Sequence, residues 1–189
     1  MKIKMELLSD VVFGNGMSVP GAEDISVLCD EYGFPYYKGG TFKGVFREEL
    51  KRYLSWTLTD EDNIEDFVVQ LLGESDSNGT DNGKLIFSDF ELSGAVKQKM
   101  LETIDKDKAD IIKESLTHIR TFTKIGEDGM VKDGSLRSCR CVNKGLFLYS
   151  EIKCRPEDES MVKEVLGLIK WIGTMRNRGF GKVKISVEQ

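Results

Sequence analysis

Apolar residues recur at spacings of three and four over residues 42–54, and this period predicts a helix with one apolar face. Thr41 lies just before that segment and is expected to cap the helix N-terminus. The same period predicts a second helix over residues 62–72 and a third over about 156–173, the last beginning at a proline. Three segments of the chain therefore have the pattern of helices that pack one face on a core.

Runs rich in β-branched and aromatic residues predict the strands between these helices. They cover residues 3–13, 84–92, 117–125, 183–187 and, as one long or bent strand, 136–154. The resulting order of strands and helices is that of the split βαβ arrangement of ferredoxin-like and RNA-recognition folds. We therefore expect an α+β fold with a modified ferredoxin-like, RNA-recognition-type core (βαββαβ), inserted helices and a β-hairpin.

The chain has 189 residues, which predicts one domain spanning 1–189. Its expected core comprises residues 1–54, 83–92 and 136–189. A helical insertion is expected over about 55–82 and 93–116, and a protruding hairpin over about 117–135. The polar segment 74–83 is expected to be a loop within the insertion.

No apolar run approaches 18 residues, so we expect no membrane span, and the N-terminus lacks the pattern of a secretory signal. Four cysteines without an even disulfide framework fit a reducing compartment and predict a cytoplasmic protein. Cys139, Cys141 and Cys154, with His118, raise the alternative of a zinc site. No second closely spaced cysteine pair exists, so buried thiols are favoured over structural zinc.

Charge is unevenly distributed along the chain, whose net charge is −5. Residues 55–115 hold 15 acidic and 6 basic side chains, a balance of −9, which leaves about +4 elsewhere. The segment 170–184 holds five basic residues and no acidic one. This division is consistent with separate faces for separate partners, although a solvated helical surface is the favoured explanation of the acidic stretch.

Two groups of basic residues are candidates for binding nucleic acid. Lys43, Arg47 and Lys51 share one face of the first predicted helix, where the alternative is a solubilising face paired with acidic neighbours. A second group lies in a glycine-rich loop near the C-terminus, where glycine would allow backbone N–H groups to approach a phosphate. The loop residues expected to bind RNA, unless the loop is an ordinary surface turn, are Arg176, Arg178, Gly179, Gly181 and Lys182.

Three segments together resemble the RAMP superfamily of CRISPR-associated proteins. They are K-G-G-T-F-K-G-V-F-R-E-E-L at 38–50, G-K-L-I-F-S-D-F-E-L-S at 83–93 and W-I-G-T-M-R-N-R-G-F-G-K-V at 171–183. Residues 120–147 are more weakly similar to the part of the family that forms a thumb hairpin, which wedges between nucleotides of a guide–target duplex. The resemblance adds Arg120 to the expected RNA-binding residues and makes Phe122 and Met130 candidate wedges, unless the hairpin is simply packed.

Within that superfamily the chain most resembles the repeating backbone subunit of type III effector complexes. The segment D-I-S-V-L-C-D at 24–30 is similar to the context of the RNA-cleaving aspartate of that subunit, which implies Asp24 as the catalytic residue and Glu23 as a fallback. The resemblance further implies guide RNA, target RNA, head-to-tail copies of the chain and other effector subunits as partners. Cleavage would proceed in the assembled complex by 2′-OH attack with a divalent metal ion such as Mg²⁺.

Two other functions remain open from the sequence. One is a structural RAMP subunit that binds RNA without cutting it. The other is an RNA-recognition-type domain outside CRISPR systems. Cleavage assays on an Asp24 variant would separate the first alternative, and gene neighbourhood would separate the second.

Overall fold

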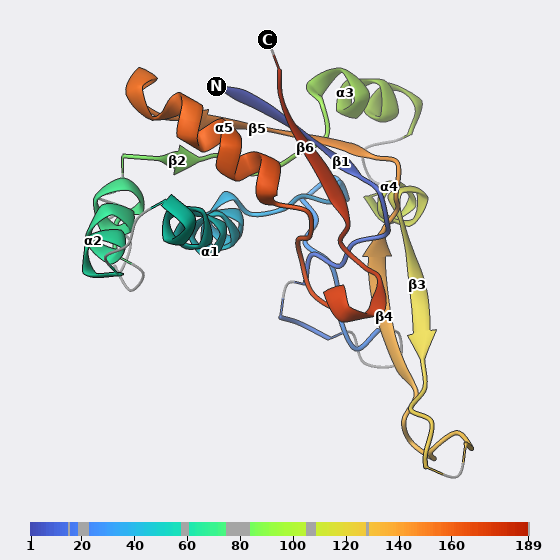
Figure 1. Ribbon diagram of the computed structural model, residues 1–189. Coiled ribbons are helices and arrows are strands. Elements are labelled where there is room, and N and C mark those ends of the chain that lie inside the picture. Colours follow the sequence, from blue (N-terminus) through green and yellow to red (C-terminus); the bar gives the residue numbers. More distant parts are fainter. Residues whose placement is uncertain are drawn as a thin grey trace.

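A four-stranded antiparallel sheet with strand order β2-β5-β1-β6 forms the centre of the molecule (Figure 1). Strand β1 (Lys2–Leu7) pairs with β5 (Phe147–Lys153) on one side and with β6 (Val183–Glu188) on the other. The short strand β2 (Ile86–Phe87) pairs with β5 at the edge. This order, with one helix after the first strand and another before the last, is that of a ferredoxin-like sheet, and the expected α+β fold is confirmed.

The computed structural model describes residues 1–14, 16–18, 23–57, 61–74, 84–104, 109–127 and 129–188. Residues 58–60, 75–83 and 105–108 of the expected helical insertion lie outside the described residues, and with them nearly all of the polar loop expected at 74–83. Within the described segments, no helix is both long and apolar enough to cross a membrane.

The core lies between one face of this sheet and the helices that cover it. Alternate residues of β1, among them Ile3 and Met5, point into this core and are fully buried. Helix α1 (Gly39–Thr57) packs on α5 (Glu159–Leu168), which follows a 3-10 turn, η1 (Pro156–Asp158). Helix α1 buries the predicted apolar face through Phe42, Phe46, Leu50 and Leu54.

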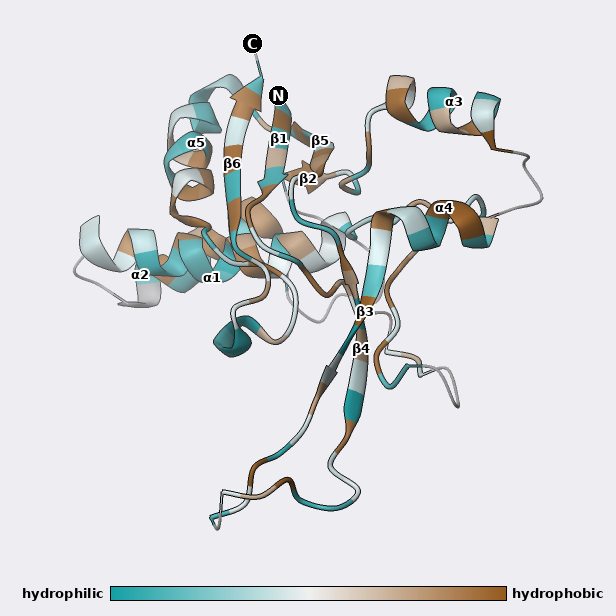
Figure 2. Cartoon of the chain, turned by 90° about the vertical axis from the view of Figure 1, so that its right-hand side faces the viewer, coloured by the Kyte–Doolittle hydropathy of each residue, from teal (hydrophilic) through white to brown (hydrophobic). Residues whose placement is uncertain are grey.

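The remaining helices lie on both sides of the sheet. Helix α2 (Glu61–Leu72) packs against α1. Figure 2 shows α1, α2 and α5 on one side of the sheet, with α3 (Gly94–Thr103) and α4 (Ala109–Leu116) on the other. The chain continues from α4 directly into a second, two-stranded sheet.

The second sheet is a hairpin formed by β3 (Thr117–Phe122) and β4 (Arg137–Val142). It projects away from the body of the molecule, so that its tip stands clear of every helix (Figures 1 and 2). The residues between the strands put exposed apolar side chains on the tip, namely Ile125, Met130, Val131 and Leu136.

The expectation of one continuous strand over 136–154 is wrong. A turn separates β4 from β5, because the Asp10 carboxylate accepts a hydrogen bond from the backbone N–H of Lys144 at 3.1 Å. Gly145 then adopts a left-handed conformation with φ of 84°, which a strand residue does not have. The first strand is also shorter than expected, since β1 ends at Leu7.

The expectation that Thr41 caps α1 is also wrong. The helix begins two residues earlier, where the Asp89 carboxylate accepts a hydrogen bond from the backbone N–H of Gly39 at 2.7 Å. Asp89 belongs to the segment 84–92, which was expected to be a strand throughout. Only Ile86–Phe87 is β-strand there, because the following residues turn to cap the helix.

Candidate nucleic-acid interface

The glycine-rich loop after α5 leaves the body of the molecule through a narrow neck. Trp171 and Lys182 pair across this neck, and the backbone N–H of Ile172 donates to the carbonyl of Gly181 at 2.9 Å. Gly181 has a φ of 81°, and a Cβ atom there would overlap the carbonyl oxygen of Ile172. Glycine is therefore required at this position for the chain to close the loop.

Inside the loop, a 3-10 turn, η2 (Arg176–Arg178), lies between two left-handed residues, Met175 and Gly179. The backbone N–H groups of Arg178 and Gly179 donate to carbonyls of the same loop. Those of Gly181 and Lys182 donate to the Asp10 carbonyl and the Ser9 hydroxyl.

These four N–H groups are satisfied within the chain, so they do not form a free backbone cradle for phosphate. RNA binding by the loop residues stays a prediction. What the loop offers to a ligand is its exposed side chains, those of Arg176, Arg178 and Lys182.

Phe180 fixes this loop to the β3–β4 hairpin. Its side chain is buried in a small second core with Val12, Cys139 and Cys141, and its ring meets that of Phe122 edge to face with centroids 5.7 Å apart. A ring placed between two glycines can enter the core without its neighbours interfering. The loop and the hairpin therefore form one continuous surface.

Two arginines cover these two rings from outside. The guanidinium of Arg120 lies 4.9 Å from the centre of the Phe180 ring, and that of Arg178 lies 5.5 Å from the centre of the Phe122 ring. Such contacts hold a cation in place without neutralising it. We call Arg120, Phe122, Arg178 and Phe180 the arginine–aromatic cluster. Arg120 is also 3.6 Å from the Asp10 carboxylate, so part of its charge is compensated.

A hollow of about 470 Å³ adjoins this cluster on the hairpin. Phe122 and Arg178 form one wall, and Lys124 and Arg137 add two more positive charges. Sequence reasoning missed Phe180, Lys124 and Arg137. The available signal was an aromatic residue between two glycines, together with basic residues near both ends of the predicted hairpin.

The candidate wedge residues of the hairpin lie in different surroundings. Phe122 packs against Phe180 at the base of the hairpin, which is the packed alternative for this residue. Met130, in contrast, is 70% exposed at the tip. The wedge role of Met130 stays a prediction.

Two of the three basic residues expected to flank RNA on α1 contact α2 instead. Arg47 donates to the carbonyl of Gly73 at 2.7 Å, where α2 ends, and Lys51 forms an ion pair of 2.7 Å with Glu65. Arg47 and Lys51 thus link α1 to α2 and its C-terminal end. Lys43 is half-buried on the same helix. RNA binding by these three residues stays a prediction.

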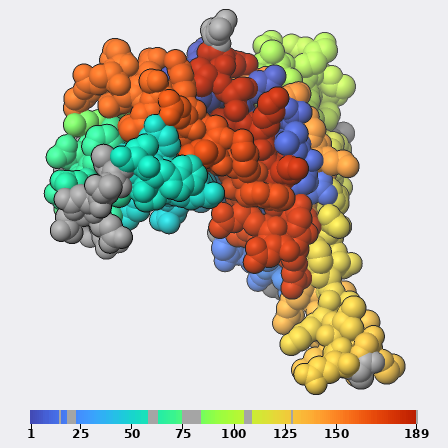
Figure 3. Space-filling view, in the orientation of Figure 1, coloured from blue at the N-terminus to red at the C-terminus, as the bar shows by residue number. Residues whose placement is uncertain are grey.

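The start of α1, however, lies beside the glycine-rich loop. The hydroxyl of Tyr37, two residues before the helix, hydrogen-bonds with the backbone of Gly173. It also interacts electrostatically with the positive charge of Arg176. Burial raises the pKa of Tyr37 to about 12 despite these two contacts, which lower it. Figure 3 shows the C-terminal segment bordering α1 on one face of the molecule.

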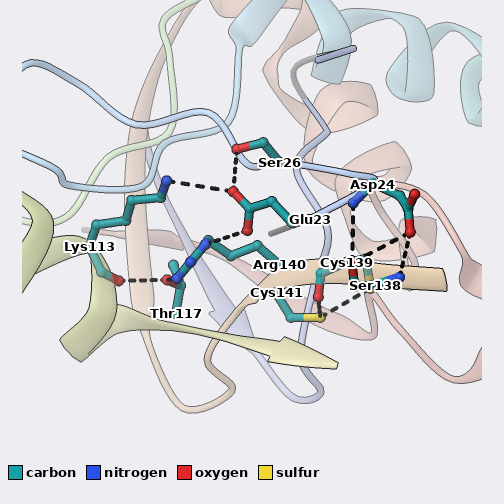
Figure 4. A network of polar contacts seen from close by, with 9 residues as sticks. All are labelled: Glu23, Asp24, Ser26, Lys113, Thr117, Ser138, Cys139, Arg140 and Cys141. Atoms are coloured by element: carbon teal, nitrogen blue, oxygen red, sulfur yellow. Dashed lines mark hydrogen bonds and ion pairs between the residues drawn. The ribbon is translucent and has the colours of Figure 1, made fainter. Parts of the chain in front are cut away.

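Asp24 is exposed and lies against the base of the hairpin (Figure 4). Its carboxylate oxygen Oδ2 accepts a hydrogen bond of 2.7 Å from the backbone N–H of Ser138 in β4. Its own N–H donates to the Ser138 carbonyl at 3.0 Å. Because Ser138 precedes Cys139, which packs with Phe180, Asp24 is close to the arginine–aromatic cluster.

Glu23 is not available as the fallback carboxylate. It is 2% exposed and pairs with Arg140 through a 2.6 Å contact between Oε2 and Nε (Figure 4). Ser26 donates to its other oxygen at 2.9 Å, and Lys113 lies 3.7 Å away. The residue therefore anchors its segment to β4 rather than facing a ligand.

The cysteines and the histidine are accounted for by packing and hydrogen bonds. The sulfurs of Cys139 and Cys141 lie 3.6 Å apart, and burial raises the pKa of both thiols. His118 contacts the Asn143 side-chain oxygen at 2.6 Å and Asp10 at 3.5 Å. Across the described segments, no three His, Cys, Asp or Glu side chains are grouped so as to hold a metal ion.

Comparison with known proteins decides the family. The model of the RAMP superfamily matches residues 4–184, nearly the whole chain. The chain belongs to the RAMP superfamily. The match confirms the recognition made from its glycine motifs, and it includes both the loop and the hairpin described above.

Solved structures give the same fold for this RAMP protein. A cryo-EM structure of the type III-B Cmr-beta complex bound to cognate target RNA contains a chain with a TM-score of 0.69 and 15% identity, covering 97% of this chain and 95% of that one. The apo state of Cmr-beta gives a TM-score of 0.70 and 15% identity, with coverage of 100% and 96%. No curated protein sequence matches this chain.

Proposed function

We propose that this RAMP protein is an RNA-binding backbone subunit of a type III CRISPR effector complex, and that it cleaves bound target RNA. The observation that carries the RNA-binding part is the arginine–aromatic cluster, where two separate segments place arginines over a shared pair of rings. The family and the fold of Cmr-beta chains support the assignment to an effector complex.

The surface around the cluster has the chemistry that single-stranded RNA requires. Arginine guanidinium groups bind phosphate oxygens in a bidentate manner, and they keep their charge at any physiological pH. Arg120, Lys124, Arg137 and Arg178 lie around one hollow and its neighbouring rings. Bases can stack on exposed guanidinium planes while the phosphates meet these charges.

Replacing Arg120 and Arg178 together with alanine is expected to lower the affinity of the full chain for single-stranded RNA roughly 10- to 100-fold. The logarithmic salt slope should fall by about 1.4, since each phosphate contact contributes about 0.7. Fluorescence anisotropy at several salt concentrations measures both quantities.

The matched control is Arg52→Ala with Arg155→Ala, because both side chains form exposed ion pairs away from the cluster. Removing these two arginines subtracts the same formal charge. If the control lost as much RNA affinity and salt slope, the effect would be due to net charge, and the arginine–aromatic cluster would not be the RNA-binding site.

Assembly along the guide would join copies head to tail. The charge division of the chain fits such heterologous contacts, in which one surface meets a different surface of the next copy. The acidic stretch 55–115 includes α2, α3 and α4, whereas the basic residues of the loop lie at the hairpin base. Unlike charges on separate surfaces favour such pairing over pairing of identical surfaces.

Cleavage would use the 2′-hydroxyl of the target RNA as nucleophile. Its oxygen bonds to phosphorus while the bond to the 5′-oxygen breaks, Asp24 takes up the 2′-proton, and solvent protonates the 5′-oxygen. A divalent ion such as Mg²⁺, bound through substrate phosphate and water, would offset the developing negative charge and leave Asp24 able to take up the proton.

A further inference from the structure

The shortest contact that holds the Asp24 carboxylate comes from a backbone group. Ser138 pairs with Thr121 of β3 in register, yet its N–H donates to Oδ2 of Asp24 at 2.7 Å. The Asp24 N–H returns a bond to the Ser138 carbonyl at 3.0 Å. The two residues thus form a closed, reciprocal pair across the outer edge of β4. The Ser138 hydroxyl adds two longer contacts, donating to Oδ2 of Asp24 at 3.4 Å and accepting from the Asp24 N–H at 3.3 Å.

Contacts on both sides fix the register of this pair. Ile25 forms a parallel bridge with Cys139, and the Arg140 N–H donates to the Ile25 carbonyl at 2.9 Å. On the other side, buried Glu23 pairs with Arg140 at 2.6 Å. Residues 23–25 therefore follow 138–140 as an added strand, and the position of Asp24 depends on the hairpin (Figure 4).

An unrestrained aspartate in a loop samples several rotamers and meets a reacting group only part of the time. A catalytic carboxylate needs its geometry held to within about 0.5 Å. The bond to Oδ2 restricts the rotamers of the side chain, which is exposed and can therefore be reached by a ligand. A peptide N–H is well suited to this task because it has no rotamers of its own.

We propose that Ser138 is the positioning residue for Asp24, acting through its backbone N–H. This inference rests on the proposed cleavage of target RNA by Asp24. It also means that the hairpin which bears the arginine–aromatic cluster fixes the carboxylate, so that RNA contact and carboxylate position share one rigid element.

Ser138→Pro is the variant that removes this group. Proline lacks the N–H, and its ring displaces the Asp24 carboxylate from its place 2.7 Å from that nitrogen. In the assembled complex at saturating target RNA, we expect the single-turnover cleavage rate to fall roughly 10- to 100-fold. Affinity for target RNA should stay within error of the unmodified complex. Ser138→Ala keeps the N–H, so its cleavage rate should fall clearly less than that of Ser138→Pro.

A second measurement needs neither a cleavage assay nor the Ser138→Pro variant. In the full chain without RNA, the amide resonance of Ser138 should move upfield in Asp24→Ala, because its bond to the carboxylate is lost. An unmoved Ser138 amide would overturn the inference, even if Ser138→Pro fails to fold.

The two proposals fail in different ways. Unchanged cleavage in Asp24→Ala would overturn the proposed cleavage function and, with it, the positioning role. Loss of cleavage in Asp24→Ala together with an unchanged rate in Ser138→Pro would overturn the positioning role alone. A Ser138→Pro complex that loses rate only through weaker target binding would also overturn it.

Discussion

Replacing Asp24 with alanine is expected to abolish cleavage of target RNA by the assembled complex while leaving RNA binding intact. Asp24 is an exposed carboxylate at the base of the hairpin, and its neighbour Glu23 is committed to an ion pair with Arg140. Glu23 is therefore not available to replace it. A group that moves a proton in the transition state contributes roughly 100- to 10,000-fold to the rate.

The measurement is single-turnover cleavage of labelled target RNA by complexes assembled with each variant. Asp24→Asn should behave like Asp24→Ala, because the amide keeps the shape of the side chain but takes up no proton. Asp66→Ala removes an exposed aspartate of α2 and serves as the control. Cleavage at the unmodified rate in Asp24→Ala would leave the chain with a structural, non-cleaving role in its complex.

Arg140→Ala is expected to lower the free energy of unfolding by about 3–5 kcal/mol. Arg140 is 12% exposed, and its loss leaves Glu23, 2% exposed, without its closest partner. A buried charge without a partner costs far more than the pair contributes when intact. Lys113, 3.7 Å from Glu23, compensates in part, so the lower end of the range is expected. Urea denaturation of the full chain measures the change.

Two further variants give this prediction its controls. Arg155→Ala breaks an exposed ion pair with Glu157 and should cost less than about 1 kcal/mol. Glu23→Leu combined with Arg140→Met removes both charges and should recover most of the lost stability. Equal costs for Arg140→Ala and Arg155→Ala would show that the Glu23–Arg140 pair does not anchor its segment.

The helices, and the order in which strands and helices follow one another along the chain, could be predicted from the sequence because both depend on local periodicity. The apolar face of α1 is a run of three- and four-residue spacings. Phe42, Phe46, Leu50 and Leu54 of that face are buried, and Val45 and Tyr53 are half-buried. The predicted ends of helices and strands were less accurate. Helix α5 ends at Leu168 rather than near Gly173, since the period does not show where the chain leaves the helix for the glycine-rich loop.

Contacts between distant segments were outside the reach of the sequence pattern. Asp89 caps α1 from 50 residues away, and Glu23 meets Arg140 across 117 residues. Both side chains are acidic residues in segments that local rules assign to a strand and a loop. Their partners become apparent only once the sheet brings the segments together.

The candidate site was predicted only in part, because it too depends on contacts between distant segments. Charge and glycine content pointed to the loop, and family resemblance pointed to Asp24 and Arg120. The docking of Phe180 on Phe122, which joins loop and hairpin, is a tertiary contact with no periodic signal. The sequence pattern could not show that α2 packs beside the basic stripe on α1 and contacts Arg47 and Lys51.

Ultraviolet cross-linking of the full chain to single-stranded RNA, with mass spectrometry of the cross-linked peptides, tests most directly whether loop and hairpin form one RNA-binding surface. Cross-links are predicted within residues 117–124 and 173–182, which contain the arginine–aromatic cluster. Cross-links confined to α2, α3 or the sheet face opposite α1 and α5 would contradict the account.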